Sequence, residues 1–223
     1  MTTFELDGPR LAPAAGGAPK QLVVFLHGYG ADGNDLIALG REWAPLLPHA
    51  AFVSPHAPEP CGMAPMGRQW FDLSMGDMSI IAAGVKRAAP ALDSFLDAEL
   101  ERQGLTADSL ALVGFSQGTM MALAVGLTRE ARPAAIVGYS GALATVEGLP
   151  PLGQGPAILL VHGDMDEVIP VEAMTIAREA LGQAGLQVQW HVSRGIGHGI
   201  DGDGLRLGGE FLKQAFEGTL TAG

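Results

Sequence analysis

The sequence predicts a compact α/β domain in which a mostly parallel sheet carries helices on both faces. Short apolar runs rich in strand-forming residues alternate with stretches of helical length, and this alternation is typical of parallel strands joined by helical crossovers. The run at residues 21–26 lacks a polar residue at every second position, as expected for a strand covered on both faces. A chain of 223 residues without an internal repeat or a linker is expected to form one domain over residues 1–223.

Seven short apolar runs are the expected strands. Each is followed by a polar residue or a glycine at which a turn can begin. In chain order, these runs cover residues 3–6, 21–26, 50–53, 110–113, 134–139, 157–161 and 186–192. Residues 10–20, rich in proline, glycine and alanine, are expected to be a loop.

Five further stretches are the expected helices, and they cover residues 35–47, 79–103, 119–129, 171–183 and 204–216. In the longest one, apolar residues recur at helical spacing and predict its buried face. These residues are Leu92, Phe95, Leu96 and Leu100. Pro90 is a point at which this helix can be disturbed.

Composition narrows the classes of function. Apolar residues make up 48% of the chain, which argues against disorder, and no apolar run approaches the ~18 residues of a membrane span. The net charge of −11 disfavours nucleic acid and anionic membrane surfaces as partners. Cys61 is the only cysteine, and the N-terminal residues show no signal-peptide pattern, so we expect a cytoplasmic protein without an intrachain disulfide.

The motif Gly114-Phe115-Ser116-Gln117-Gly118 joins an apolar strand directly to a helix. In such a turn the serine is forced into a strained backbone conformation, and only glycines two positions before and after it leave room. The helix N-terminus favours a developing negative charge there. Ser116 is therefore the candidate nucleophile. Ser140 follows another apolar run but lacks the second glycine, so we interpret it as a strand-end or capping serine.

A serine nucleophile needs a histidine base that is oriented by a carboxylate. After a turn of this kind the acid precedes the histidine in the chain. His191 falls inside an expected strand, and His162 precedes both candidate acids. His198 lies between glycines after the last strand, where a loop can present an imidazole, so we expect it to be the base.

The acid is expected in the loop that follows the strand 157–161, which holds Asp164 and Asp166. Asp164 directly follows a glycine and can bond the amides of its own turn, whereas Asp166 lies farther out, so we favour Asp166. Asp201 and Asp203 are close in sequence to His198 and are expected to cap the last helix.

Acyl transfer also needs amide donors for the oxyanion. The residue after the nucleophile supplies one, here Gln117, and the loop after an earlier strand supplies the other. That loop is His27-Gly28-Tyr29-Gly30, and we assign the second donor to the Tyr29 amide. We expect His27 to hold the loop by side-chain hydrogen bonds rather than to take part in the chemistry.

Taken together, these segments resemble the carboxylesterase/phospholipase family of α/β-hydrolases, which includes acyl-protein thioesterases. The resemblance spans nearly the whole chain and implies a Ser116–Asp166–His198 triad, a small ester substrate and no cofactor. It rests on Phe25-Leu26-His27-Gly28-Tyr29-Gly30-Ala31-Asp32, Arg68-Gln69-Trp70-Phe71-Asp72, Gly114-Phe115-Ser116-Gln117-Gly118, His162-Gly163-Asp164-Met165-Asp166 and Gly197-His198. The chain departs from the family at Tyr29, where leucine is frequent, and at Glu167, where proline is frequent, and both departures leave the substrate open.

A long proline-, glycine- and methionine-rich segment at about residues 55–78 is expected to be a substrate-binding insertion, because an idle connection would be shorter. Its methionine and aromatic side chains are of the kind that line acyl slots, although they could instead only cover the edge of the sheet. The expected binding residues are Met63, Met66, Trp70 and Phe71. Nothing basic adjoins Cys61 to activate its thiol.

The sequence thus predicts a metal-independent serine esterase acting on short- to medium-chain or aryl esters. Acyl-protein thioesters and lysophospholipids are the alternative substrates, and a peptidase or amidase reaction is a weaker alternative. A binding protein on an inactive hydrolase scaffold is the non-enzymatic alternative, although every expected catalytic residue is present. No His-Glu-x-x-His spacing indicates a metal site. The oligomeric state stays open, a homodimer included.

Overall fold

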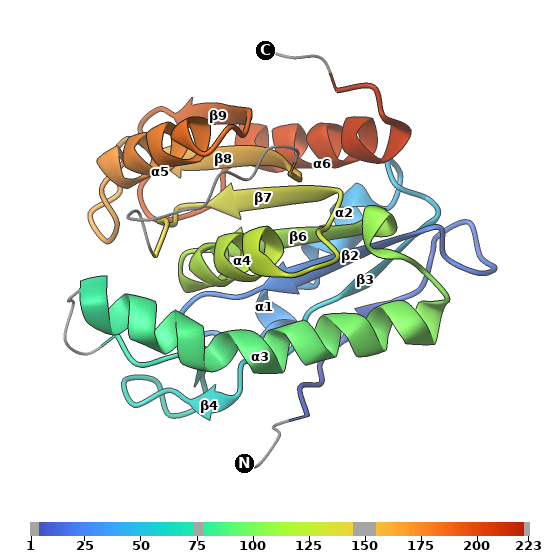
Figure 1. Ribbon diagram of the computed structural model, residues 1–223, viewed down its shortest axis with the longest axis horizontal. Coiled ribbons are helices and arrows are strands. Elements are labelled where there is room, and N and C mark those ends of the chain that lie inside the picture. The colour runs from blue at the N-terminus through green and yellow to red at the C-terminus, as the bar shows by residue number, and fades with distance from the viewer. Residues whose placement is uncertain (1–4, 74–77, 145–154, 221–223) are drawn as a thin grey trace.

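The computed structural model describes residues 5–73, 78–144 and 155–220 (Figure 1). Its main sheet has seven strands in the order β1-β3-β2-β6-β7-β8-β9, and every neighbouring pair is parallel except β1 with β3. The strands are β1 (Arg10–Leu11), β2 (Gln21–Leu26), β3 (Ala50–Val53), β6 (Leu110–Phe115), β7 (Ala135–Tyr139), β8 (Ala157–Gly163) and β9 (Val188–Ser193). This sheet confirms the predicted fold class.

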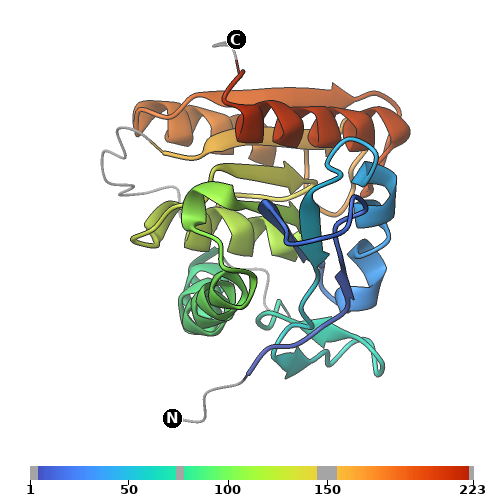
Figure 2. The ribbon, with the colours of Figure 1, turned by 90° about the vertical axis from the view of Figure 1, so that its right-hand side faces the viewer.

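The helices cover both faces of the sheet (Figures 1 and 2). They are α1 (Gly33–Leu36), α2 (Leu39–Trp43), α3 (Met78–Gln103), α4 (Gln117–Thr128), α5 (Glu172–Gln183) and α6 (Gly202–Glu217), with a 3₁₀ turn at Ala107–Ser109. One apolar core lies between the sheet and α3, α4 and α5, and a second lies between the sheet and α1, α2 and α6. Alternate strand residues point into the two cores: Val24 lies in the first, and Val23 and Phe25 lie in the second.

The predicted helix at residues 35–47 is instead two short helices. It begins earlier, at Gly33, because Asp32 caps it and accepts the Asn34 amide at 2.8 Å. Between α1 and α2 the chain tightens into i→i+3 hydrogen bonds, from Gly40 N to Ile37 O and from Arg41 N to Ala38 O. The chain approaches β3 closely here, since a Cβ added to Gly40 would lie 2.8 Å from the Phe52 ring.

Four further segments correct or add to the expectations. The loop expected at residues 10–20 contains the edge strand β1, because Arg10–Leu11 pair with Phe52 and Val53. The strand expected at residues 3–6 is not seen at residues 5 and 6, and residues 3 and 4 lie outside the described part. Residues 55–73 hold a small antiparallel pair, β4 (Glu59–Pro60) and β5 (Arg68–Gln69). The long helix α3 continues through Pro90.

The parallel register brings the carboxyl ends of five strands to one edge of the sheet. Leu26 is opposite Gly114, Phe115 is opposite Tyr139, and Gly163 is opposite Ser193. The loops that hold Ser116 and His198 therefore begin at the same edge of the sheet, after β6 and β9, as expected for reactive groups in open α/β sheets. Among the described helices, none is long and apolar enough to cross a membrane.

Candidate active site

Ser116 occupies the turn between β6 and α4 with a strained backbone, φ 54° and ψ −116°. Its amide donates to the Tyr139 carbonyl at 2.9 Å, which ties the turn to the neighbouring strand. Side chains at the flanking glycines are excluded: an added Cβ would lie 2.4 Å from Gly118 O at Gly114 and 1.8 Å from Leu26 O at Gly118. The two glycines are thus required by close backbone approach, which is the reason that the motif predicted.

His198 and Asp166 are brought together by the loops after β9 and β8. The Nδ1 atom of His198 lies 2.8 Å from Oδ2 of Asp166, whose side chain is fully buried. The imidazole also packs on the Phe115 ring, with 4.9 Å between ring centroids. Because Phe115 precedes Ser116, this contact places the imidazole beside the turn that holds the serine.

The Asp166 carboxylate is held ionised by its hydrogen bonds. Its Oδ1 accepts the amides of Val168 and Ile169, each at 2.9 Å. Burial acts to raise the pKa of this carboxyl, but the hydrogen bonds from His198 and the two amides outweigh it and hold the pKa below its usual value. A charged acceptor thus faces Nδ1 of His198, so Nδ1 carries the hydrogen and Nε2 is left free to accept a proton.

Asp164 binds the loop that holds His198 rather than its own turn. Its Oδ1 accepts the Gly195 amide at 2.6 Å, and its amide donates to Ser193 O at 3.1 Å. Gly163 permits this close approach, because an added Cβ there would lie 2.2 Å from Ile196 O. Asp164 is therefore a structural residue, as expected, but it joins two loops instead of stabilising one.

Ser140 has a contact that the sequence did not indicate. Like Ser116, it has a positive φ, here 45°, and its hydroxyl donates to the carbonyl of Gly199 at 3.2 Å. The residue thus anchors the loop next to His198. The sequence feature that could have indicated this contact is the position of Ser140 directly after a strand. Asp201 caps α6 as predicted, accepting the Gly204 amide at 2.9 Å, and Asp203 lies in the first turn of that helix.

The loop after β2 lies against the serine. A Cβ added to Gly28 would be 3.4 Å from the Ser116 Cβ. Within the described ranges, the amides of Tyr29 and Gln117 donate to no protein acceptor, so both are available to a ligand.

His27 holds this loop with both ring nitrogens. Burial lowers its pKa to about 4, so the imidazole is neutral. Its Nδ1 donates to Gly28 O at 2.8 Å, while its Nε2 accepts the Ala57 amide at 3.0 Å. This is the supporting role expected for His27.

The four expected binding residues separate into two groups. Trp70 and Phe71 are fully buried, and the Trp70 indole donates to the His27 carbonyl at 3.0 Å. Because they are buried, neither ring forms a wall of a ligand site in this structure. Their burial could not be predicted, because this segment has no clear hydrophobic periodicity. Met63 and Met66 are 81% and 92% exposed.

An open hollow of about 580 Å³ adjoins the loop after β2. Its lining residues are Gly30, Ala31, Asp32, Asn34, Asp35, Ala64, Pro65, Met66 and Gly67.

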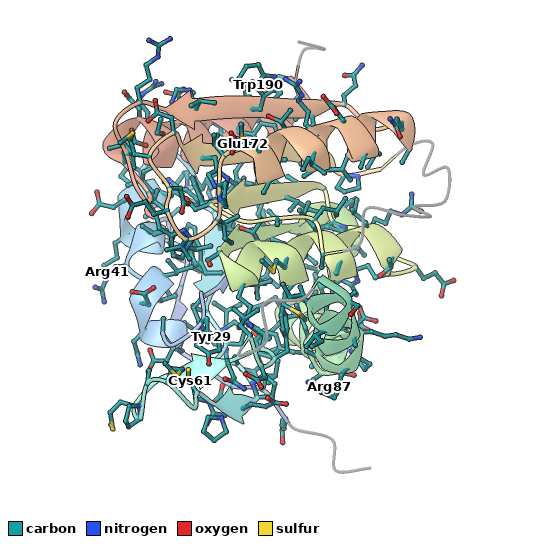
Figure 3. All side chains as sticks on the ribbon, turned by 90° about the vertical axis from the view of Figure 1, so that its left-hand side faces the viewer. Tyr29, Arg41, Cys61, Arg87, Glu172 and Trp190 are labelled. Atoms are coloured by element: carbon teal, nitrogen blue, oxygen red, sulfur yellow. The ribbon has the colours of Figure 1, made fainter. Side chains whose placement is uncertain are left out.

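The Tyr29 side chain reaches the hairpin β4–β5. Figure 3 shows it beside Cys61, which is buried. A hydrogen bond with Cys61, with burial as a smaller contribution, raises the pKa of Tyr29 to about 12. The side chain therefore links the loop after β2 to the hairpin β4–β5. No group of three or more His, Cys, Asp or Glu residues stands together as metal ligands in the part of the chain that the structure covers.

Comparison with known proteins gives a family. Residues 13–216 match the Phospholipase/Carboxylesterase family model. The chain is 30% identical to Esterase YpfH of Escherichia coli over 92% of its own length and 89% of that protein's. It is 29% identical to acyl-protein thioesterase 1 of Neurospora crassa, with 89% and 87% covered. The crystal structure of esterase PE8 superposes with a TM-score of 0.89 at 42% identity, covering 95% of this chain and 99% of that one. This chain belongs to the Phospholipase/Carboxylesterase family.

Proposed function

We propose that this protein is a serine carboxylesterase that hydrolyses short- to medium-chain or aryl carboxylic esters through an acyl-enzyme. The observation that carries the proposal is the 2.8 Å contact between Asp166 Oδ2 and His198 Nδ1 beside the strained Ser116. A buried carboxylate, an imidazole and a serine at a helix N-terminus form the arrangement that activates a hydroxyl.

In the proposed reaction, Nε2 of His198 removes the Ser116 proton while the serine oxygen attacks the ester carbonyl carbon. The ionised Asp166 stabilises the imidazolium that forms. The imidazolium then protonates the departing alcohol as the carbon–oxygen bond breaks. Water, activated by the same imidazole, releases the acid from the acyl-enzyme and restores the serine hydroxyl.

The negative charge on the carbonyl oxygen is stabilised by the amides of Tyr29 and Gln117. Gln117 is the first residue of α4, so the helix dipole adds to its hydrogen bond. Gly28 brings the other loop against the serine, and His27 holds that loop in place. Donors fixed before the reaction are more effective than mobile ones, because they need no reorganisation when the charge develops.

A thioester substrate is the second candidate, and the relation to acyl-protein thioesterase 1 of Neurospora crassa favours it. The same residues would act, with a thiol as the leaving group. Rates on p-nitrophenyl esters of increasing chain length, beside an acyl thioester and a lysophospholipid, separate these substrate classes.

A fluorophosphonate probe tests the nucleophile. It should label wild-type protein at Ser116, and Ser116→Ala should lose both the label and about 10⁴- to 10⁶-fold in ester hydrolysis with unchanged circular dichroism. Ser140→Ala is the matched control, since that serine also has a positive φ, and it should keep the label. A folded Ser116→Ala variant with a tenth of wild-type activity would refute the proposal.

A further inference from the structure

His162 is a buried histidine that lies close to Asp166, and the proposed triad has no role for it. It lies in β8 and is 1% exposed. Its Nε2 atom is 2.7 Å from the Ile169 carbonyl oxygen and 3.2 Å from Asp166 Oδ2. The same carboxylate oxygen faces Nδ1 of His198 at 2.8 Å. Nitrogens of two imidazole rings, His162 and His198, therefore lie close to the same oxygen, Oδ2 of Asp166.

The two neighbours of this nitrogen determine where the His162 hydrogen lies. A backbone carbonyl and an ionised carboxylate are both acceptors and have no hydrogen to give. Nε2 must therefore carry the hydrogen, because an unprotonated nitrogen would place its lone pair against two oxygens. The N–H donates to the Ile169 carbonyl and has its positive end close to Asp166 Oδ2.

We propose that His162 is a positioning residue for hydrolysis, which acts on His198 through Asp166. The inference rests on the proposed function, because it concerns the acid of that reaction. His162 Nε2 donates a hydrogen bond to the carbonyl of Ile169, and the amide of Ile169 donates to Asp166 Oδ1 at 2.9 Å. His162 thus supports one carboxylate oxygen through the backbone and faces the other directly.

The second contact has an electrostatic consequence. An N–H dipole beside Oδ2 stabilises the carboxylate charge and weakens the pull of Asp166 on the His198 hydrogen. Without that dipole, Asp166 should bind the His198 imidazolium more strongly, so the acidic limb of the kcat/KM profile should move to higher pH. The acid would also be less firmly oriented, so turnover should fall. A purely structural role of His162 predicts a loss of stability without a shift of the pH profile.

Other ionisable groups lie on the two loops that carry Asp166 and His198, and they stay unchanged in the test. Asp164 and Glu167 lie on the loop after β8, and Arg194 and Asp201 lie on the segment that contains His198. A shift that follows substitution of His162 alone therefore reports its own contact.

Two variants separate the N–H group from the ring. His162→Phe keeps a planar ring without a donor, and His162→Gln supplies an amide N–H. We expect His162→Phe to lower kcat about 10- to 100-fold, the scale seen when an outer hydrogen-bond partner is lost, with KM changed less than about twofold. The acidic limb of its kcat/KM profile should move up by roughly 0.5–1 pH unit. His162→Gln should recover most of both effects.

His191→Phe is the control, because His191 is a half-buried histidine on the adjacent strand β9. It should leave kcat and the pH profile unchanged. A readout without turnover is ¹⁵N-histidine NMR of the wild-type protein: the His162 signals, assigned by their loss in His162→Gln, should show the Nε2–H tautomer.

The outcomes distinguish this inference from the proposed function. If both His162 variants fold and keep the wild-type pH profile, or if His162 is the Nδ1–H tautomer, the inference is wrong although Ser116 can still be the nucleophile. If His162→Phe does not fold, the NMR tautomer decides the question, because the inference requires the Nε2–H form. If the fluorophosphonate probe does not label the wild-type protein, the proposed function is refuted instead.

Discussion

The side-chain carbonyl of Gln117 accepts the backbone amide of Trp70 at 2.9 Å, across 47 positions of sequence. The other end of the same side chain donates to the Phe71 carbonyl at 2.7 Å. The residue after the proposed nucleophile therefore fixes the end of the insertion with its side chain, and its backbone amide stays available at the serine. Because the Trp70 indole also donates to His27 O, hydrogen bonds join the turn at Ser116, the segment around Trp70 and the loop after β2.

Replacing Gln117 with leucine should destabilise the protein by about 2–6 kcal/mol. The leucine fills a similar volume but leaves the Trp70 amide and the Phe71 carbonyl buried without partners, at about 1–3 kcal/mol each. Urea unfolding of wild-type and variant protein measures the difference. Gln183→Leu is the control, because Gln183 is exposed at the end of α5, and its midpoint should match the wild type. A Gln117→Leu midpoint equal to the control would show that these two bonds add no stability.

Replacing each of the two aspartates in the loop after β8 with asparagine should have different effects on activity and stability. Asp166→Asn should lower kcat by about 10⁴-fold, because the amide cannot hold His198 in the tautomer that accepts the serine proton. Asp164→Asn should keep most of kcat, since an asparagine oxygen can still accept the Gly195 amide that Asp164 binds at 2.6 Å, and it should chiefly lower the melting temperature. Steady-state kinetics on one ester, beside thermal unfolding, gives both quantities. The opposite order of kcat losses would assign the acid to Asp164.

The positions of several central strands could be predicted, because buried strands depend on local sequence. The strands at 21–26 and 50–53 are found at their expected bounds, since buried parallel strands are short apolar runs that end in turns. The turn at Ser116 could be predicted because its glycines are required by close backbone contacts.

Contacts between distant segments could not be predicted in this way. The bond from Gln117 to Trp70 and the contact from Ser140 to Gly199 join loops far apart in sequence. The hairpin β4–β5 has strands of two residues each, too short for any periodicity to show. Only the folded chain brings these groups together.

Acid should weaken the fold through His27. Burial lowers the pKa of this histidine from 6.5 to about 4, so the unfolded chain binds a proton between these values that the folded protein does not. The free energy of unfolding should therefore fall as pH drops from 6.5 to about 4, by about 3 kcal/mol for this group, and show no further His27 contribution below that range. Urea unfolding across this range measures the slope. His27→Gln should be less stable at pH 7 and lack that part of the slope, and an unchanged slope would contradict the assignment.

Trp70→Ala separates a core role from a role in substrate selection. Trp70 is 1% exposed, donates its indole hydrogen to His27 O and packs beside the His27 ring, so we expect a loss of about 3–5 kcal/mol in unfolding free energy. Trp190→Ala is the matched control, because Trp190 is 51% exposed and contacts Arg178 through a cation–π interaction, which is worth only about 0.5–1 kcal/mol at such a site. The ester chain-length profile of surviving Trp70→Ala protein should keep its shape, since the ring faces no ligand space. A stable variant with chain-length preference altered by about 10- to 200-fold would instead make Trp70 a wall of the acyl slot.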